Sequence, residues 1–297
     1  MKFRAHDTFF IRRGWLHKGV KHVHANPGVF LGRGGANPMD ALGIGANMVK
    51  SLRYWLQAVG LTEENTAKRR EQTLTTFGKI IRDCDPYFEE LGTLWLLHYR
   101  LASNQKEATA WWWFFNEFRL SEFSREDFVT QISGWSRFKD EEKDRNVSVR
   151  SLEDDFDCII HTYLPRVKSN PERVDPESNI DCPLGELGLV GIADRRRKTY
   201  RKLPPAKGTL PPLVLLAVLS DQANGQDEIR IADIQSAHCN AGKIFNLDII
   251  TLTGLLYQLE LLKHLKVVRT AGLDVVRFTS KRTFEACVEL YYGGLGK

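Results

Sequence analysis

The chain has 297 residues, of which 42% are hydrophobic, and its formal net charge is +5 at pH 7. This length predicts two or three domains with a sizeable buried core, and the modest charge excludes a polycation. The charge is uneven, because residues 1–60 hold nine Lys and Arg against Asp7 and Asp40, a net +7 that leaves −2 for the remainder. A positive field concentrated in one segment is typical of a phosphate-binding surface.

Several classes of protein are disfavoured by patterns that the sequence lacks. The five cysteines are widely spaced, which predicts reduced, mostly buried thiols and argues against a disulfide framework. No apolar run approaches the ~20 residues that span a bilayer, and the N-terminus lacks the apolar stretch of a signal peptide. There is no P-loop, Rossmann fingerprint or nucleophile elbow. We therefore expect a cytoplasmic protein without a membrane partner.

The most informative stretch covers residues 37–61 and predicts a short helix, a glycine turn and a second helix. Asn37 is a suitable N-cap, Pro38 occupies the first helical position, and Gly43 can adopt the left-handed conformation that ends the short helix. The polar stretch 61–72 that follows could form a wing or a linker. This order of elements predicts a winged helix-turn-helix, a fold that binds nucleic acid.

The second helix of this pair has two unlike faces. Its apolar side chains recur at helical spacing on one stripe: Met48, Leu52, Trp55, Leu56 and Val59. The opposite face presents Asn47, Lys50, Arg53, Tyr54 and Gln57. Such side chains can contact phosphates and base edges in the major groove, so we predict that they bind double-stranded DNA, together with Arg13 and Lys18. The alternative is an ordinary amphipathic helix with a solvated cationic face.

The middle of the chain is predicted to be helical. Leu91–Leu101 is nearly all apolar and predicts a core helix, and the aromatic run Trp111–Phe115 is too large to leave in water. We expect this run to pack in the core, with base stacking by one exposed ring as the alternative. Ser148–Tyr163 predicts another helix, with Ser151 as its N-cap.

Two polar stretches follow this helix. Residues 165–183 contain four prolines and predict a loop. The basic run Asp194–Lys198 could be an exposed strand or a linker that touches phosphate, but a solvated charge run is the simpler alternative.

The C-terminal part repeats the winged-helix pattern. Helices are predicted at Leu213–Leu219, Ile231–Ala241 and Asp248–Leu262, followed by two wing strands. Opposite its buried stripe, the last helix shows Gly254, Tyr257, Gln258 and Leu261, with no cation. This face favours protein docking or a structural role over DNA binding.

The expected fold is mainly α with small β wings. It would comprise an N-terminal winged helix-turn-helix in residues 1–75, a helical middle region in 76–200, and a C-terminal winged-helix domain in 201–297.

Several strings together resemble a known family. They are His6–Phe9 with Arg12, Trp15 and Lys18; Leu42–Ser51; Gly92–His98; Cys182–Leu184; and Arg269–Asp274. The chain resembles a bacterial family of unknown function, of about this length, that includes SspB, the DNA-nicking component of Ssp-type DNA phosphorothioation systems. The resemblance covers nearly the whole chain.

This resemblance implies a DNA-binding component that nicks one strand so that sulfur can be placed in the backbone. It also implies partners, namely a cysteine desulfurase, an ATPase and an ATP-pyrophosphatase-like protein. The alternative is a non-catalytic DNA-binding adaptor or regulator that recruits the sulfur-transfer enzymes. The chain could also form a homodimer.

If the protein nicks DNA, carboxylates near the basic segment are the candidate ligands for Mg²⁺ or Mn²⁺. Asp7 is the first candidate because a carboxylate inside a positive segment repels phosphate unless it holds a metal. His6 would then be a proton acceptor or second ligand, and Arg12 would steady the phosphate. The simpler alternatives are that Asp7 pairs with Arg4 or Arg12, or caps a turn. The next candidate metal ligands are Asp85, Glu89 and Glu90.

Overall fold

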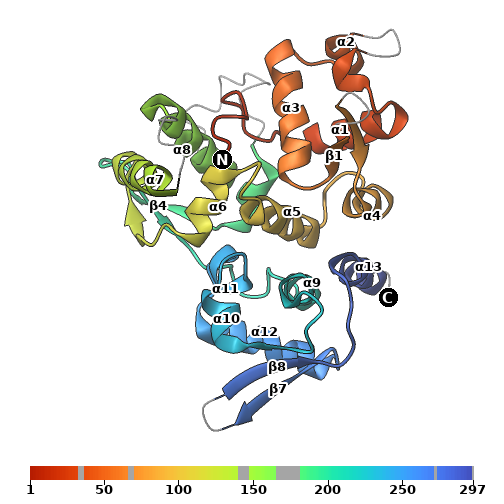
Figure 1. The fold of residues 1–297 in the computed structure, drawn as a ribbon, viewed down its shortest axis with the longest axis vertical. Helices are drawn as coiled ribbons and strands as arrows, with labels where there is room; N and C mark the ends of the chain where they lie inside the picture. Colours follow the sequence, from red (N-terminus) through yellow and green to blue (C-terminus); the bar gives the residue numbers. More distant parts are fainter. Residues whose placement is uncertain (33–36, 66–69, 140–146, 165–180, 271–272, 296–297) are drawn as a thin grey trace, which may run out of the picture.

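The computed structural model describes residues 1–32, 37–65, 70–139, 147–164, 181–270 and 273–295. Over these ranges the chain is mainly helical with small antiparallel sheets (Figure 1). Most of the predicted loop at residues 165–183 lies outside the described ranges. No single described helix is long and apolar enough to cross a membrane; the pair Ile231–Ile244 and Ile249–Leu261 reaches that length only jointly, across a 90° break.

The N-terminal elements include the predicted pair of helices and a hairpin. In chain order they are α1 (Trp15–Ala25), the 3-10 turn η1 (Val29–Leu31), α2 (Pro38–Leu42), α3 (Ala46–Ala58), β1 (Thr62–Asn65), β2 (Glu71–Leu74) and α4 (Thr76–Cys84). The side chain of Asn37 accepts a hydrogen bond from the backbone N–H of Met39 (3.1 Å), and Gly43 follows α2 with φ 58°. The helix, glycine turn and second helix predicted from the sequence are therefore confirmed.

Helix α1 is present in the structure but was not predicted from the sequence. It forms because Trp15, Leu16, Val20 and Val23 recur on one buried face. Gly19 lies so close to α3 that a Cβ there would come within 2.7 Å of a Leu56 methyl carbon. Contact with α3 thus holds α1 in place.

The middle of the chain combines helices with a three-stranded sheet. Its elements are α5 (Leu91–Ser103), α6 (Thr109–Asn116), β3 (Glu122–Phe123), α7 (Arg125–Lys139), α8 (Val149–Tyr163), the 3-10 turn η3 (Pro183–Leu187), β4 (Val190–Asp194) and β5 (Thr199–Lys202). The strands pair in the antiparallel order β3–β5–β4. All residues of α6 are buried, so the aromatic run packs in the core as expected. Ser148, and not Ser151, caps α8, because its side chain accepts from the N–H of Ser151.

The C-terminal elements include a second three-stranded sheet. They are α9 (Pro212–Ala223), β6 (Glu228–Arg230), α10 (Ile231–Ser236), α11 (Ala241–Ile244), α12 (Ile249–Leu261), β7 (Leu265–Thr270), β8 (Leu273–Phe278) and α13 (Phe284–Leu295). The antiparallel order is β6–β8–β7. The single helix predicted over 231–241 is divided into α10 and α11, since Cys239 between them has φ 60°.

Helix α5 lies between the N-terminal and C-terminal elements (Figure 1). The indole N–H of Trp95 donates to the carbonyl of Thr209 (2.7 Å), and the two ring nitrogens of His98 each lie 2.8 Å from an oxygen, of Tyr163 and of Ile244. Burial lowers the pKa of His98 to about 4, so the ring is neutral at pH 7. Residues from all three predicted domains share one continuous core.

Candidate nucleic-acid interface

Three of the predicted site residues surround a hollow beside the glycine turn. This space of about 580 Å³, named here the turn hollow, lies where the start of α1 faces the first turn of α3, and its cations are Arg12, Arg13 and Lys18. Arg13 pairs with Glu186, and the guanidinium of Arg12 lies 5.5 Å from the ring centre of Trp15. Lys18 has no ion-pair partner among the described residues, so its charge is available to an anion.

The backbone adds to the positive field of the turn hollow. Gly45 precedes α3 and provides no side-chain cap, and both Gly45 and Met48 line the hollow. The first N–H groups of a helix have no intrahelical acceptor, and they give the helix start a partial positive charge. Three cations and this helix start suit a phosphate group of a nucleic acid.

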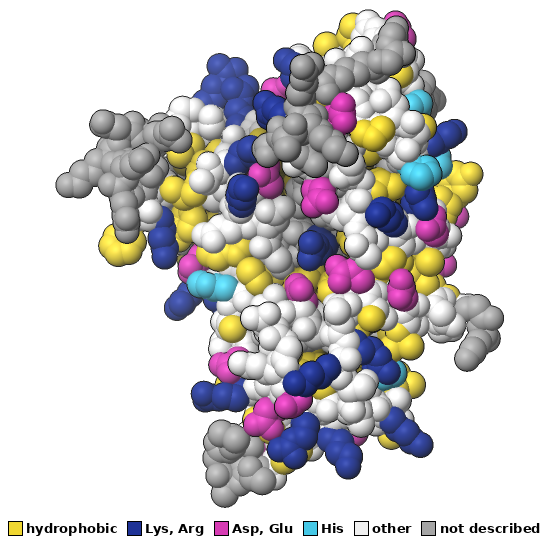
Figure 2. Space-filling view, turned by 45° about the vertical axis from the view of Figure 1, so that its right-hand side comes forward, with side chains coloured by type: hydrophobic (Ala, Val, Ile, Leu, Met, Phe, Trp, Pro, Cys, Tyr) yellow, Lys and Arg dark blue, Asp and Glu magenta, His cyan; other side chains and the backbone are white. Residues whose placement is uncertain are grey.

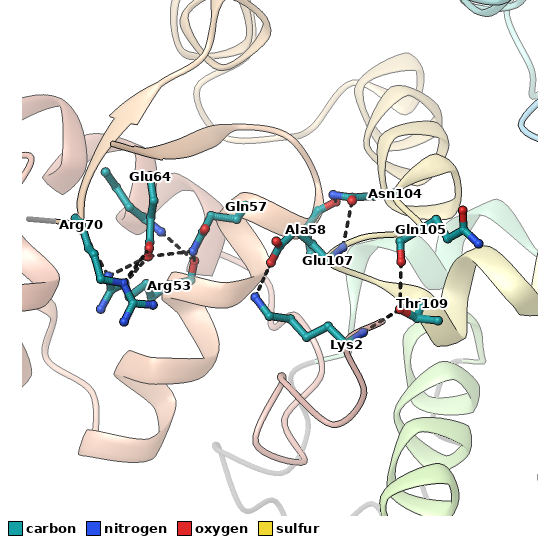
Figure 3. Close-up of polar contacts among 11 residues, drawn as sticks. Lys2, Arg53, Gln57, Ala58, Glu64, Arg70, Asn104, Gln105, Glu107 and Thr109 are labelled. Carbon is teal, nitrogen blue, oxygen red and sulfur yellow. Dashed lines mark hydrogen bonds and ion pairs between the residues drawn. The ribbon is translucent and has the colours of Figure 1, made fainter. Parts of the chain in front are cut away.

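The polar face of α3 lines a second hollow. This space of about 200 Å³, named here the hairpin hollow, lies between α3, the hairpin β1–β2 and the N-terminal segment (Figure 3). Its cations are Lys2, Lys50, Arg53 and Arg70. Glu64 is the acid of the lining, and it pairs with Arg53 (Nη2–Oε1 2.6 Å) and with Arg70 (Nε–Oε2 3.3 Å). Glu64 and Glu107, which pairs with Lys2, are fewer than the four cations, so this hollow is positive.

The N-terminal residues are tied to the start of α6, as Figure 3 shows. The backbone N–H of Lys2 donates to Thr109 Oγ1 (2.8 Å), and the Lys2 ammonium pairs with Glu107. This contact brings a cation from the chain start to the edge of the hairpin hollow. Charge count alone includes Lys2 in the basic segment, but no local pattern shows that it would lie beside α3.

Of the five residues predicted on the polar face of α3, four are accessible to solvent. The side chains of two of these four are already paired with another residue. Asn47 and Lys50 are exposed, and Lys50 has no ion-pair partner within the described ranges. Arg53 is held by Glu64, and Gln57 Nε2 donates to the same carboxylate (3.2 Å). The sequence did not reveal this acid, because it comes from the hairpin and not from α3.

Tyr54 differs from the prediction. Its side chain is buried, with its ring centre 5.0 Å from that of Trp55 and 6.4 Å from that of His6. Burial, with the nearby Asp155, raises the pKa of the phenol well above its ordinary value. Tyr54 therefore packs in the core, and at 7% exposure only the edge of its side chain reaches the hairpin hollow, because the N-terminal segment covers that side of α3.

The predicted catalytic residues do not converge. His6 is fully buried; its Nε2 lies 2.8 Å from Asp155 Oδ1, and its Nδ1 accepts the N–H of Thr8 (3.1 Å). Both ring nitrogens are thus occupied, and the ring is not available to a phosphate or a metal at the surface. Asp7 is exposed on a turn with φ 52°, while Arg12 lies at the turn hollow.

Arg4 also has a partner other than the expected one. Its Nε lies 2.6 Å from Asp154 Oδ2, and its backbone N–H donates to Asp155 Oδ1 (3.0 Å). Arg4, Asp7 and Thr8 all have positive φ, a conformation that costs free energy for residues other than glycine. The contacts to α8 therefore hold this strained segment, and Asp7 has no ion pair within the described part of the chain.

The second set of candidate metal ligands is arranged around a helix cap. Asp85 is buried and accepts the backbone N–H groups of Glu89 and Glu90 (both 3.0 Å) and the hydroxyl of Thr93 (2.6 Å). Both carboxylate oxygens are occupied at the start of α5, while the side chains of Glu89 and Glu90 are exposed. Among the described residues no group of three or more His, Cys, Asp or Glu could hold a metal ion. The predicted ligands Asp7, Asp85, Glu89 and Glu90 thus do not fit a Mg²⁺ or Mn²⁺ site in this arrangement.

Basic side chains also lie away from α3 (Figure 2). The run Asp194–Lys198 forms the exposed turn between β4 and β5. Asp194 Oδ1 accepts the backbone N–H groups of Arg196 (2.7 Å) and Arg197 (3.1 Å), which fixes the turn. This run, for which an exposed strand, a linker or a solvated charge run was expected, therefore forms an exposed basic hairpin turn.

Comparisons with known proteins agree with this arrangement of elements. A magnesium ion-bound crystal structure of SspB matches with a TM-score of 0.84, and another SspB crystal structure with 0.83. Each SspB chain is 26% identical in sequence to this chain, and each match covers 99% of this chain and 87% of the SspB chain. No curated protein matches. Residues 3–292 match the model of a family described as a protein of unknown function, DUF4007. The chain therefore belongs to the DUF4007 family, as its sequence strings predicted.

Proposed function

We propose that this protein is the DNA-binding component of a DNA phosphorothioation system. The observation that carries the proposal is the gathering of seven cations around α3, in the turn hollow and the hairpin hollow. Asn47 and Lys50 are exposed on α3, and Lys50 lines the hairpin hollow. Cations that flank an accessible polar helix are what phosphate contacts on either side of a groove require.

In this proposal the elements from α1 to β2 act as a winged helix-turn-helix. Helix α3 enters the major groove, where Asn47 can read a base edge and Lys50 can contact phosphate. Arg12, Arg13 and Lys18 contact the backbone on one side. The hairpin with Arg70 contacts it on the other side, as a wing does.

The assignment to a phosphorothioation system rests on the similarity to SspB over almost the whole chain. The partners that this assignment implies are a cysteine desulfurase, an ATPase and an ATP-pyrophosphatase-like protein. A protein that brings these partners to DNA needs one surface that binds the duplex and a second surface that binds proteins.

Strand nicking is the activity implied by the same similarity. The described residues do not complete a metal site around Asp7, so we propose Asp7 only as one acid of the nicking site. Asp7 is exposed at the basic end of the chain on a strained turn, a conformation that clusters at functional sites. We propose no role in nicking for His6, because its ring is buried against Asp155.

Incubation of the protein with supercoiled plasmid tests this proposal, with Mg²⁺ or Mn²⁺ and, in parallel, with EDTA. Open-circle product that depends on the metal supports nicking, whereas a mobility shift without such product supports the adaptor. Asp7→Asn should abolish nicking and retain the mobility shift. The matched control is Asp40→Asn, which changes the only other acid of the first 60 residues. Equal nicking by both variants would exclude Asp7.

A further inference from the structure

Helix α12 is apolar on two opposite faces. Its inner face packs in the core through Leu252, Leu255, Leu256 and Leu259. Its outer face carries Ile250 and Leu261, which are 82% and 81% exposed, and Tyr257, which is 42% exposed. A helix that is hydrophobic all round is normally buried all round, and an exposed apolar stripe marks an interaction surface.

The outer stripe has a symmetric spacing. With Gly254 included, its members are residues 250, 254, 257 and 261, which lie within about 60° of one another on a helix. Intervals of four, three and four residues are the same when read in either direction. If two α12 helices lie antiparallel across a two-fold axis, Ile250 of one copy meets Leu261 of the other, and Gly254 meets Tyr257. An isologous interface needs this kind of self-complementary surface.

The sizes of the facing side chains also match. Gly254 is exposed, and a Cβ built there would have no atom within 4 Å, so the surface above it is open. The tyrosine ring of a second copy could lie on this smallest residue. Arg269 of β7 lies on Tyr257, with its guanidinium 5.9 Å from the ring centre, which holds the ring in position.

The charges at the helix ends match as well. Asp248 caps the start of α12, and Lys263 is exposed just beyond its end. The same two-fold arrangement brings the end with Asp248 beside the end with Lys263 of the second copy, and it does so twice. Opposite charges at both ends favour a second copy of this chain over an unrelated apolar partner.

We propose that two copies of this chain associate through α12, antiparallel across a two-fold axis. Helix α12 and helix α3 lie at opposite ends of the molecule (Figure 1), so the association leaves the surface around α3 open. One helix from each copy is a small interface, so the dimer should form with a dissociation constant on the order of micromolar. The proposal is independent of DNA binding.

Sedimentation equilibrium of the full chain tests the register directly, over about 1–100 µM. Ile250→Glu and Leu261→Lys should each weaken dimerisation on the order of 100-fold, because each places an unpaired charge in an apolar seam. The double variant carrying both changes should restore the dimer, since each introduced carboxylate then faces an introduced ammonium group of the other copy. Phe138→Glu is the matched control, because Phe138 on α7 is 87% exposed and lies outside the stripe; it should dimerise as the unchanged chain does.

A monomeric unchanged chain over this whole range would overturn the proposal. So would a dimer that resists both single substitutions, because another face must then form it. Loss of dimer in the double variant as well would overturn the antiparallel register, provided that its circular dichroism matches the unchanged chain. All three substituted side chains are exposed, so folding is expected to persist.

Discussion

His6 Nε2 lies 2.8 Å from Asp155 Oδ1, and both side chains are buried although 149 residues separate them. The His6 ring also stacks on Trp55 of α3 (6.2 Å between ring centres) and meets the edge of Trp111 of α6 (5.6 Å). One short N-terminal segment therefore joins α3, α6 and α8. A buried polar contact thus holds the basic segment in place, so the residues on its surface are also held in position.

Removal of Asp155 should destabilise the protein far more than removal of its neighbour. Asp155→Ala leaves the His6 ring nitrogen and the Arg4 N–H without their buried acceptor, which should cost about 2–4 kcal/mol. Asp154→Ala removes an ion pair to the largely exposed Arg4 and should cost less than about 1 kcal/mol. Urea unfolding of both variants at neutral pH measures the difference. Equal small losses would show that the buried contact does not anchor the segment.

Glu64 neutralises part of the positive charge of the hairpin hollow. Glu64→Gln removes the carboxylate that pairs with Arg53 and Arg70, so both guanidinium groups become available to phosphate. We expect affinity for any DNA duplex to rise several-fold at low salt, with a steeper dependence on salt concentration. Fluorescence anisotropy over a salt series is the measurement, and Glu63→Gln on the same strand is the control. A fall in affinity with intact folding would mean that Glu64 orients Arg53 for DNA.

Asn47 is the exposed amide at the start of α3 and the candidate for reading a base edge. Asn47→Ala should relax the preference at one base pair by about 1–3 kcal/mol and leave nonspecific affinity unchanged. Selection from a randomised duplex library compares the preferences of the two proteins. Identical preferences would remove Asn47 from base recognition.

Lys202 should make stability depend on pH. Its ammonium donates to the carbonyls of Phe114 and Phe118 (2.6 Å to the latter) and lies 4.6 Å from the centre of the Phe114 ring. Burial, with a smaller effect of Lys243, lowers the pKa of Lys202 to about 7. The unfolded chain keeps this proton up to a pH of about 10.4. Between the two values the unfolded state binds more protons, so stability from this group rises with pH.

Lys202→Met should remove that rise. Between pH 7 and about pH 10 the unchanged chain should gain roughly 3–4 kcal/mol relative to the variant's profile, because Met has no proton to release on folding. Urea unfolding at several pH values gives both profiles, and Lys207→Met, at an exposed position, is the control. Parallel profiles for Lys202→Met and the unchanged chain would show that Lys202 stays charged in the fold.

The helix pair and the core helix α5 follow from the sequence because their signals are local. Asn37, Gly43 and the stripe through Leu52 and Trp55 each act within a few residues. Helix α1 has two weaker features, an internal glycine and several histidines, and it is stabilised by contact with α3. Propensity within the segment could not reveal that contact.

The division of α10 from α11 has a similar cause. Cys239 adopts its left-handed conformation where its N–H donates to the side chain of Asn116 (2.6 Å), which comes from α6. Parts of the candidate site likewise depend on contacts between distant residues, which local sequence patterns do not show. The exposure of Lys50 follows from helical periodicity. The burial of His6 depends on Asp155, which lies 149 residues away, and Tyr54 is covered in turn by the His6 ring.

The most direct test of the proposed DNA-binding surface is the salt dependence of binding to a short duplex. Lys18 and Lys50 lie one in each hollow, and neither has an ion-pair partner among the described residues. The Lys18→Ala, Lys50→Ala double variant should bind all duplexes more weakly, and the slope of log affinity against log salt should fall by about two, since two phosphate contacts are lost. The control, Lys207→Ala with Lys281→Ala, should keep the original affinity and slope. Unchanged affinity and slope in the Lys18, Lys50 variant would contradict the account.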